Sequence, residues 1–361
     1  MLQKKFRAGI VGATGMVGQR FISLLENHPF FTPVLFAASA SSAGKKYKDA
    51  VAGRWKLPVP MPEYARDMTV CDAADVSLIK RECDFVFCAV NMPKADTKAL
   101  EEAYASAGIP VVSNNSANRN VPDVPMIVPE INCSHLEVIP FQRKRLGTKT
   151  GFIAVKPNCS IQSYAPIIAA LLEYGPCEAL ASTYQAISGA GKTFEQWPEM
   201  VDNVIPFISG EEEKSEKEPL KLLGKVEDGV IVPMEGLNIT TQCIRVPVSD
   251  GHLATVFLKF KNPPTKEQFI AATERFGTLP GGLKLPSSPD RFITYFSEDD
   301  RPQTKLDRML YNGMGVSYGR LRPDSIFDWK FVGLSHNTLR GAAGGAVLIA
   351  ELLAETGYFG G

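Results

Sequence analysis

The chain has 361 residues, enough for about two domains of average size. Its 39 Lys and Arg residues balance 39 Asp and Glu residues, and the resulting zero net charge argues against nucleic acid or an acidic membrane surface as a partner. Apolar residues at 45% and charged residues at 22% are typical of a folded globular protein, which excludes a wholly disordered or fibrous chain.

The start of the chain has some features of a signal peptide. Lys4, Lys5 and Arg7 precede an apolar run, but regularly spaced glycines interrupt that run. No segment approaches the roughly 20 uninterrupted apolar residues that a membrane helix needs. We therefore expect a cytoplasmic protein without a membrane-spanning segment.

The first half of the chain alternates between strand and helix patterns. Residues 6–11 predict a buried strand, a glycine turn follows, and apolar residues at helical spacing continue until residue 28. The further predicted elements are strands at 34–38, 84–90 and 109–113 and a helix at 93–107. Such alternation predicts a mostly parallel sheet, with ligands at the carboxyl ends of its strands. This half is therefore expected to bind a nucleotide.

The pattern changes after residue 151 and predicts a second, α+β domain. Its strands are expected at 152–155, 179–187 and 253–260, and a helix is expected from about residue 160. Pro166 removes a backbone hydrogen bond there, so we expect that helix to kink or to start late. The charged run 211–218 is by default a solvated helix face or loop, and residues 342–355 predict a helix that packs on the first domain.

The expected fold class is α/β, with a Rossmann-like parallel-sheet domain followed by an α+β domain. We place the first domain at residues 1–157, completed by the C-terminal segment 336–361, and the second at residues 158–335.

A glycine-rich loop joins the first predicted strand to the first helix. Glycines at 12, 15 and 18 let the backbone approach a pyrophosphate, and the helix N-terminus offers free N–H groups to it. The residues expected to contact the cofactor here are Gly12, Thr14, Gly15, Met16, Val17 and Gly18.

Serines stand where an enzyme that uses NAD would place an acidic residue on the ribose, after the second strand. Ser39 and Ser42 are the expected contacts, with Ser41 between them and Lys45 and Lys46 following. Hydroxyl and ammonium groups can donate hydrogen bonds to a 2′-phosphate, which a carboxylate would repel. The predicted cofactor is therefore NADP.

The seven cysteines are odd in number and form no CxxC pair, so we expect neither disulfides nor a metal site. Cys159 differs from the others because it follows a predicted strand and directly precedes a helical stretch. A helix N-terminus or a neighbouring imidazolium lowers a thiol pKa, and the same N–H groups can stabilise an oxyanion. We therefore expect an activated thiol at this position.

Four histidines are candidates for a base, and their order in the chain does not decide among them. His252 begins a strand, and His336 begins the C-terminal segment. Both remain open on this reasoning.

With these residues in place, the sequence resembles the aspartate-β-semialdehyde dehydrogenases, particularly their fungal and archaeal branch. The likeness runs nearly end to end. The motifs that carry it are residues 12–18, 38–44, 115–119, 122–125, 128–130, 157–160, 185–191, 210–214, 245–248, 251–252 and 340–344.

The resemblance implies a glyceraldehyde-phosphate-dehydrogenase-like fold whose second domain is catalytic and forms the dimer contact. It implies that Cys159 is the nucleophile, that His252 rather than His336 is the general acid/base, and that Gln185 orients the reacting centre.

For substrate binding, the resemblance implies that Arg245 holds the α-carboxylate with its planar fork. Glu211 would bind the ammonium group, although the adjacent Glu212 remains an alternative. The remaining substrate-binding residues would be Asn118, Arg119 and Lys214, of which Arg119 and Lys214 would contact the phosphate. Further cofactor contacts would come from Ser188, Gly189 and Asn337.

The implied reaction is the NADPH-dependent reductive dephosphorylation of L-aspartyl-β-phosphate to L-aspartate β-semialdehyde, in the biosynthesis of lysine, methionine and threonine. The implied assembly is a homodimer or homotetramer. The main alternative is a malonyl-CoA-type acyl-CoA reductase on the same fold, but malonyl-CoA has no ammonium group for Glu211 to bind. N-acetyl-glutamyl-phosphate reductase and a non-catalytic NADP sensor are more distant alternatives.

Overall fold

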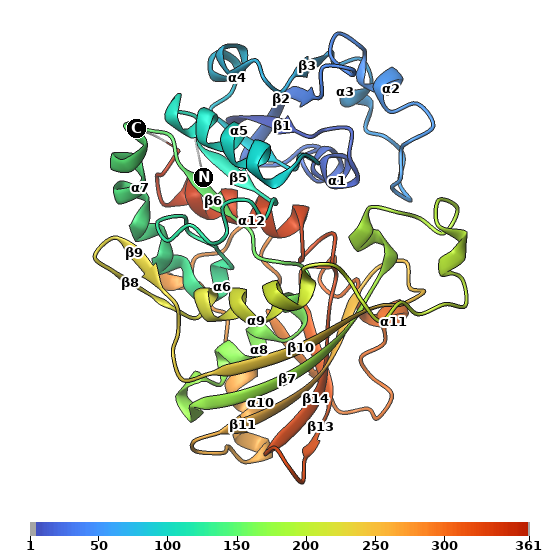
Figure 1. The fold of residues 1–361 in the computed structure, drawn as a ribbon, viewed down its shortest axis with the longest axis vertical. Coiled ribbons are helices and arrows are strands. Elements are labelled where there is room, and N and C mark those ends of the chain that lie inside the picture. The colour runs from blue at the N-terminus through green and yellow to red at the C-terminus, as the bar shows by residue number, and fades with distance from the viewer. Residues whose placement is uncertain (1–4, 360–361) are drawn as a thin grey trace.

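The computed structural model describes residues 5–359 and divides into two halves, each built on a six-stranded sheet (Figure 1). Lys4, part of the basic start considered above, lies outside the described residues, as do the last two residues of the predicted segment 336–361. No helix within residues 5–359 is long and apolar enough to cross a membrane.

The sheet of the first half is entirely parallel, in the order β3-β2-β1-β4-β5-β6. Its strands are β1 (Phe6–Val11), β2 (Phe31–Ala38), β3 (Val70–Asp72), β4 (Phe85–Cys88), β5 (Val111–Ser113) and β6 (Ile153–Val155). This is the doubly wound Rossmann order, in which the chain reverses direction of travel between β1 and β4. The predicted fold class is confirmed for this half. The strand expected at 152–155 with the second domain instead forms the edge strand β6 of this sheet, where it pairs with β5.

Continuous apolar runs explain why these strands are central. All four residues of β4 are buried, as are the last four of β1, so neither strand alternates between polar and apolar positions. Strands covered on both faces have this pattern. The covering helices are α1 (Met16–Leu24), α4 (Val76–Glu82), α5 (Lys94–Ser106) and α7 (Ile139–Leu146), with shorter helices α2 (Tyr47–Ala50), α3 (Glu63–Arg66) and α6 (Pro129–Asn132).

The C-terminal helix α12 (Ala343–Glu355) returns to the first half and packs against α1 and β5, as predicted. Its residues 343–354 are all buried, including Glu351. That carboxylate accepts hydrogen bonds from Ser287 and lies 2.9 Å from Nε2 of His28, so the buried charge has polar partners.

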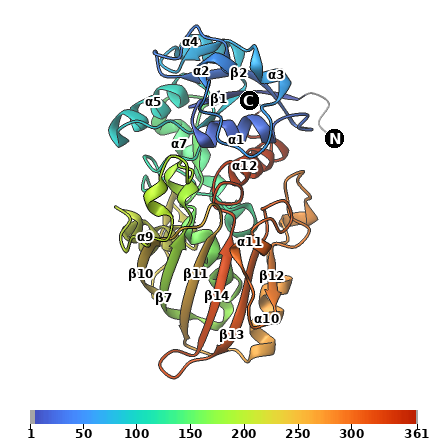
Figure 2. The same ribbon diagram turned by 90° about the vertical axis from the view of Figure 1, so that its right-hand side faces the viewer.

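The second half is a mixed sheet in the order β10-β7-β11-β14-β13-β12, which Figure 2 shows from one side. Its strands are β7 (Pro176–Gln185), β10 (Asn238–Arg245), β11 (His252–Phe260), β12 (Ile293–Phe296), β13 (Val316–Pro323) and β14 (Trp329–Ser335). A separate hairpin is formed by β8 (Lys225–Glu227) and β9 (Val230–Val232), and the helices are α8 (Ala165–Ala170), α9 (Glu211–Leu222), α10 (Lys266–Arg275) and α11 (Thr304–Asp307). Along β7 and β11 buried positions alternate with partly exposed ones, so one face of this sheet forms core and the other is more open.

The structure confirms the late start expected at Pro166. Residues Ser160–Ser163 form a short 3-10 turn, and α8 begins only at Ala165 with the proline in its first turn. The run 211–218 differs from its default interpretation. It belongs to α9, which lies between the two sheets in Figure 1 and buries Ser215 and Glu218.

Candidate active site

The glycine loop turns sharply between β1 and α1, and two of its glycines have no room for a side chain. Gly12 has φ +86°, and a Cβ there would lie 2.3 Å from the carbonyl oxygen of Ala89. A Cβ on Gly18 would lie 2.3 Å from the carbonyl oxygen of Gly12. Only glycine fits both positions, which keeps the loop backbone open at the start of α1.

A cavity of about 560 Å³, here called the strand-end cavity, adjoins this loop at the carboxyl ends of β1, β2 and β4. Among the predicted cofactor residues, Gly12, Thr14, Gly15 and Ser39 line it. Its position at the reversal of strand order is where parallel sheets bind dinucleotides. Asp72, at the end of β3, also lines it.

The basic residues of this cavity differ from those expected. Lys46 is exposed and pairs with Asp67 at 3.0 Å, and neither Lys45 nor Ser42 is among the lining residues. Arg54 and Lys56 line the cavity instead. They come from the loop after α2, which the sequence reasoning did not connect with the glycine loop. The link is Gln19 on α1, whose side chain bonds the backbone of both residues.

A smaller cavity of about 300 Å³, here called the cysteine cavity, lies where the two halves meet. Val17 of the glycine loop lines it, so the loop borders both cavities. The other predicted residues that line it are Arg119, Cys159, Ser188, Gly189, Glu211, Lys214 and Asn337. Side chains up to 320 residues apart in sequence therefore meet at one place.

Cys159 and His252 face each other in this region, with 3.4 Å between Sγ and Nε2. The backbone N–H of Ala186 donates to Nδ1 of the ring at 3.1 Å. Since Nδ1 accepts, the proton of the neutral ring is on Nε2 and points to the sulfur. His336 instead accepts hydrogen bonds from the backbone N–H groups of Thr338 and Leu339 within its own turn. The geometry therefore favours His252 over His336 as the partner of the thiol.

The expectation of a lowered thiol pKa is wrong. Burial and the Glu211 carboxylate raise the pKa of Cys159 to about 11, despite opposing effects of Lys156, Arg119 and Arg245. The helical stretch expected after the cysteine is only a short 3-10 turn, Ser160–Ser163, so no α-helix N-terminus lies directly beside the thiol. Burial and Arg245 also lower the pKa of His252 to about 3. Both groups are therefore neutral near pH 7.

Glu211, rather than Glu212, faces the cysteine cavity. Its carboxylate accepts from Lys214 at 2.9 Å and from the Asn158 side chain at 2.9 and 3.2 Å. Glu212 instead accepts from the backbone N–H of Cys243 at 3.3 Å. Although burial raises the pKa of Glu211, Lys214 and Asn158 outweigh it and lower this pKa overall. The site thus holds a carboxylate at neutral pH.

Arg245 and Gln185, like His252, lie beside the cavity rather than on its wall. Arg245, at the end of β10, donates from Nη1 to the carbonyl oxygen of Ala186 at 2.7 Å. Gln185, at the end of the neighbouring β7, has its side-chain amide 3.5 Å from Glu211. The absence of a side chain at Gly189 lets Arg245 approach the cavity wall, because a Cβ on Gly189 would lie 3.0 Å from Nη1 of Arg245.

Asn118 points away from the cysteine cavity. Its buried side chain donates to Glu101 at 2.7 Å and lines neither cavity. Its neighbour Arg119 does line the cysteine cavity.

Two of the predicted cofactor residues contact each other, since the Asn337 side chain donates to the Ser188 hydroxyl at 2.8 Å. Asn337 also accepts from the Gly251 N–H at 2.8 Å.

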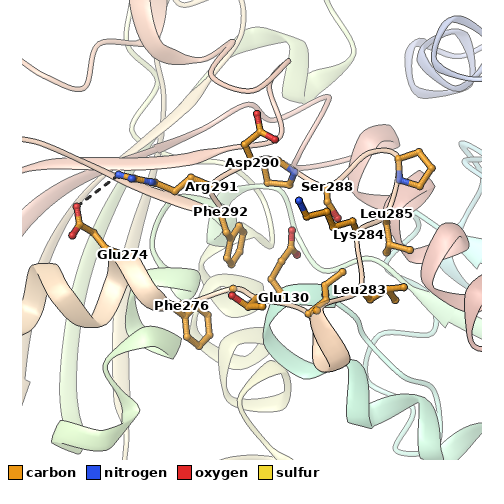
Figure 3. Close-up of a pocket in the computed structure, with 16 residues that line it drawn as sticks. Glu130, Glu274, Phe276, Leu283, Lys284, Leu285, Ser288, Asp290, Arg291 and Phe292 are labelled. Carbon is orange, nitrogen blue, oxygen red and sulfur yellow. Dashed lines mark ion pairs between the residues drawn. The ribbon is translucent and has the colours of Figure 1, made fainter.

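Figure 3 shows another cavity of about 560 Å³, which carries none of the predicted residues. The segment 276–292 forms most of its wall, and Glu274 and Arg291 approach within 3.7 Å at one side. Glu130 also lines it, but both of its oxygens accept from the Arg340 guanidinium, at 2.8 and 2.6 Å. Within residues 5–359 there is no cluster of three or more His, Cys, Asp or Glu arranged to hold a metal ion.

Comparison with known proteins identifies the family. Residues 7–139 match the model "Semialdehyde dehydrogenase, NAD binding domain", and residues 165–340 match "Semialdehyde dehydrogenase, dimerisation domain". The aspartate-semialdehyde dehydrogenase of Aspergillus fumigatus is 42% identical over 98% of each chain, and that of Methanothermobacter thermautotrophicus is 41% identical over 96% of this chain and 98% of its own. The crystal structure of aspartate semialdehyde dehydrogenase with NADP from Candida albicans superimposes with a TM-score of 0.87 at 37% identity, covering 98% of this chain and all of that one. The chain belongs to the aspartate-semialdehyde dehydrogenase family, as its motifs indicated.

Proposed function

We propose that this enzyme catalyses the NADPH-dependent reductive dephosphorylation of L-aspartyl-β-phosphate to L-aspartate β-semialdehyde. The observation that carries the proposal is the cysteine cavity. Its wall carries the Cys159 thiol, which faces His252. The Glu211 carboxylate and the cations Lys214 and Arg119 line the same cavity. An amino-acid acyl phosphate carries the matching groups, namely an electrophilic carbonyl, an ammonium and a phosphate.

The strand-end cavity fits NADP by its own geometry. A side chain at Gly12 would collide with the Ala89 backbone, so glycine keeps the loop close to β4 at the edge of this cavity, where Arg54 and Lys56 supply cations for phosphate groups. The predicted contacts of the glycine loop, together with Ser39, would hold the pyrophosphate and ribose. Val17, Ser188, Gly189 and Asn337 would hold the nicotinamide end, because they line the cysteine cavity. When bound, the cofactor supplies the hydride.

In the first chemical step, Sγ of Cys159 bonds to the β-carbonyl carbon and the carbon–oxygen bond to phosphate breaks. The product is a thioester, and the thiol proton leaves with the departing phosphate. Thiolate is a good nucleophile and a good leaving group, so the thioester accepts hydride more readily than a carboxylate does. Reduction and expulsion of the thiolate then release the aldehyde.

His252 contributes to both steps by donating from Nε2. The Ala186 N–H holds the opposite ring nitrogen as an acceptor, and the lowered pKa of His252, about 3, keeps the ring neutral. The ring therefore stabilises negative charge on the sulfur and then on the carbonyl oxygen. In this tautomer it does not accept the thiol proton at Nε2.

Recognition of the substrate α-carboxylate is assigned to Arg245. The change Arg245→Lys is expected to lower kcat/KM by about 10²-fold or more, because an ammonium cannot reproduce two parallel hydrogen bonds. Steady-state kinetics with aspartate semialdehyde as the varied substrate measure the effect, and Arg322→Lys at the exposed C-terminal end of β13 is the matched control. Unchanged kinetics for Arg245→Lys would refute this assignment.

Discrimination between NADP and NAD is assigned in part to Ser39. The change Ser39→Asp places a carboxylate against the 2′-phosphate and is expected to lower the ratio of kcat/KM for NADP over NAD by at least about tenfold. The exposed Ser41, 3.0 Å from Ser39 between the hydroxyl oxygens, does not line the cavity and provides the control Ser41→Asp. An equal fall in kcat/KM with NADP and with NAD would show that Ser39 does not contact the 2′-phosphate.

The decisive assay of the proposed function follows NADPH oxidation by the purified enzyme with aspartyl phosphate, and NADP reduction with the semialdehyde plus phosphate. Malonyl-CoA is the comparison acyl donor, and faster turnover of it would replace the proposal by the acyl-CoA reductase. The placement of a carboxylate, Glu211, in the cavity supports an aminated substrate, and the relatives compared above are named aspartate-semialdehyde dehydrogenases.

The domain limits 1–157 with 336–361, and 158–335, are part of the same proposal, as is association into a homodimer or homotetramer. The more open face of the second sheet supports a dimer contact, and the model matched by this half is described as a dimerisation domain. Light scattering measures the assembly.

A cytoplasmic location is also proposed, supported by seven cysteines that are all free thiols.

A further inference from the structure

Helix α9 turns one face toward the loop that carries Cys159. Glu211, Ser215 and Glu218 are spaced four and three apart and therefore share this face. Glu211 bonds the Asn158 side chain, and the Ser215 hydroxyl lies 3.0 Å from that of Ser160. The proposed chemistry uses Glu211 but gives no task to Glu218.

Glu218 is 4% exposed and makes two close contacts, one with each oxygen. Oε1 accepts from Nη1 of Arg119 at 2.9 Å, and Oε2 accepts from the backbone N–H of Asn158 at 2.6 Å. The first partner is the cation assigned to the substrate phosphate. The second is the residue directly before the nucleophile. One buried carboxylate thus connects the phosphate site with the nucleophile loop across 99 and 60 residues of sequence.

The next turn of α9 holds the same region from behind. Nζ of Lys221 donates to the carbonyl oxygens of Arg119 at 2.7 Å, Val121 at 2.7 Å and Val124 at 2.9 Å. Both the backbone and the guanidinium of Arg119 are therefore fixed by α9. Nη2 of this arginine donates to the Asn114 carbonyl at 2.9 Å, whereas Nε is buried without a hydrogen-bond partner among residues 5–359.

We propose that Glu218 is a positioning residue for the reaction. Through its two carboxylate oxygens it holds the Arg119 guanidinium and the Pro157–Asn158 peptide, directly before the nucleophile, at a fixed separation. The inference rests on the proposed function, since Arg119 is the phosphate contact in that mechanism. Correct placement of a cation and a nucleophile around one reacting centre lowers the barrier without any contact between Glu218 and the substrate.

Charge alone predicts the opposite result, which makes the inference testable. A carboxylate next to Arg119 offsets part of its positive field, so its removal would strengthen phosphate binding if electrostatics dominated. If positioning dominates, its removal weakens phosphate binding and slows the reaction. The sign of the change in phosphate affinity therefore separates the two.

The variant Glu218→Gln has nearly the shape of the original side chain but only one acceptor oxygen, so its amide NH₂ would face a donor. We expect the KM for phosphate in the oxidative direction to rise about tenfold and kcat to fall about tenfold or more, with the KM for NADP and the melting temperature close to wild type. Glu218→Asp keeps both acceptor oxygens on a shorter side chain, so its KM for phosphate and its kcat are expected to lie between those of wild type and Glu218→Gln. Glu213→Gln is the control on the same helix, because that carboxylate is exposed and pairs with Lys217 at 3.0 Å.

A second measurement needs no turnover. Inorganic phosphate is titrated as a protector of Cys159 against iodoacetamide, and Glu218→Gln is expected to require about tenfold more phosphate than wild type. Tighter or unchanged protection, or an equal loss of phosphate protection, NADP binding and melting temperature, would overturn the positioning role. Wild-type protein that is protected by phosphate but inactive with the aspartyl substrates would instead refute the proposed function.

Discussion

Cys159→Ser is expected to lower kcat/KM by about 10³-fold or more while NADP binding stays within about threefold of wild type. An alkoxide is a much poorer leaving group than a thiolate, so an ester at this position would not collapse to release the aldehyde. The structure adds a second reason. His252 presents Nε2–H to residue 159, because Ala186 occupies the other ring nitrogen, so no base stands ready to ionise a serine hydroxyl.

Steady-state kinetics and NADP titration by fluorescence measure the two effects separately. Cys177→Ser is the matched control, since that thiol contacts the carbonyl of Lys259 in the second sheet, away from both cavities. Mass spectrometry of wild-type enzyme quenched during turnover is expected to find the acyl adduct on residue 159. Substantial activity in Cys159→Ser would exclude the thioester, and parallel loss of NADP binding would indicate a folding role for the thiol.

The elements that sequence predicted well are those whose pattern is local. The β1–loop–α1 unit follows from an apolar run, glycines at fixed spacing and helical periodicity within about 20 residues. Strand β3 was missed because only the first of its three residues is buried. The equally short β5 and β6 are buried throughout and lie in apolar runs. The late start of α8 was expected because Pro166 acts on its own turn.

Site features that depend on distant partners were not predictable in the same way. Glu218 looked like one more charge in the run 211–218, and its task appears only when Arg119, 99 residues earlier, lies beside it. The thiol pKa was predicted in the wrong direction because burial and Glu211 act through space, not through the neighbouring sequence. The choice between Glu211 and Glu212 also needed the direction of α9 relative to the cavity.

Glu211 raises the pKa of the Cys159 thiol and is also the proposed partner of the substrate ammonium, and the change Glu211→Gln separates these two roles. We expect this variant to lower kcat/KM by about 10²-fold or more, because the substrate ammonium loses its buried partner. The same variant is expected to accelerate alkylation of Cys159 by iodoacetamide in the absence of substrate. Burial and then Glu211 are the main causes that raise the pKa of Cys159 to about 11, so loss of the carboxylate lowers this pKa.

The sign of the alkylation change follows from two opposing effects of a lower pKa. Below the thiol pKa, each unit of decrease raises the thiolate fraction about tenfold and lowers its intrinsic nucleophilicity about threefold, which leaves a net gain of about threefold. The gain is expected at pH 7–9 and is lost as the pH rises through the thiol pKa of the wild type. Above that pH both proteins are ionised and the variant thiolate is the weaker nucleophile. Glu212→Gln is the control because its side chain bonds the Cys243 N–H rather than facing the cavity.

This pair of outcomes also explains how a neutral resting thiol becomes reactive. In the proposed mechanism the substrate ammonium pairs with Glu211 and offsets the charge that opposes thiolate formation, so substrate binding is expected to lower the pKa of Cys159. Slower alkylation in Glu211→Gln would show that the carboxylate does not oppose ionisation, and activation would then have to come from Lys156, Arg119 and Arg245 alone. Faster alkylation with lost turnover would instead establish that substrate binding and thiol activation share one carboxylate.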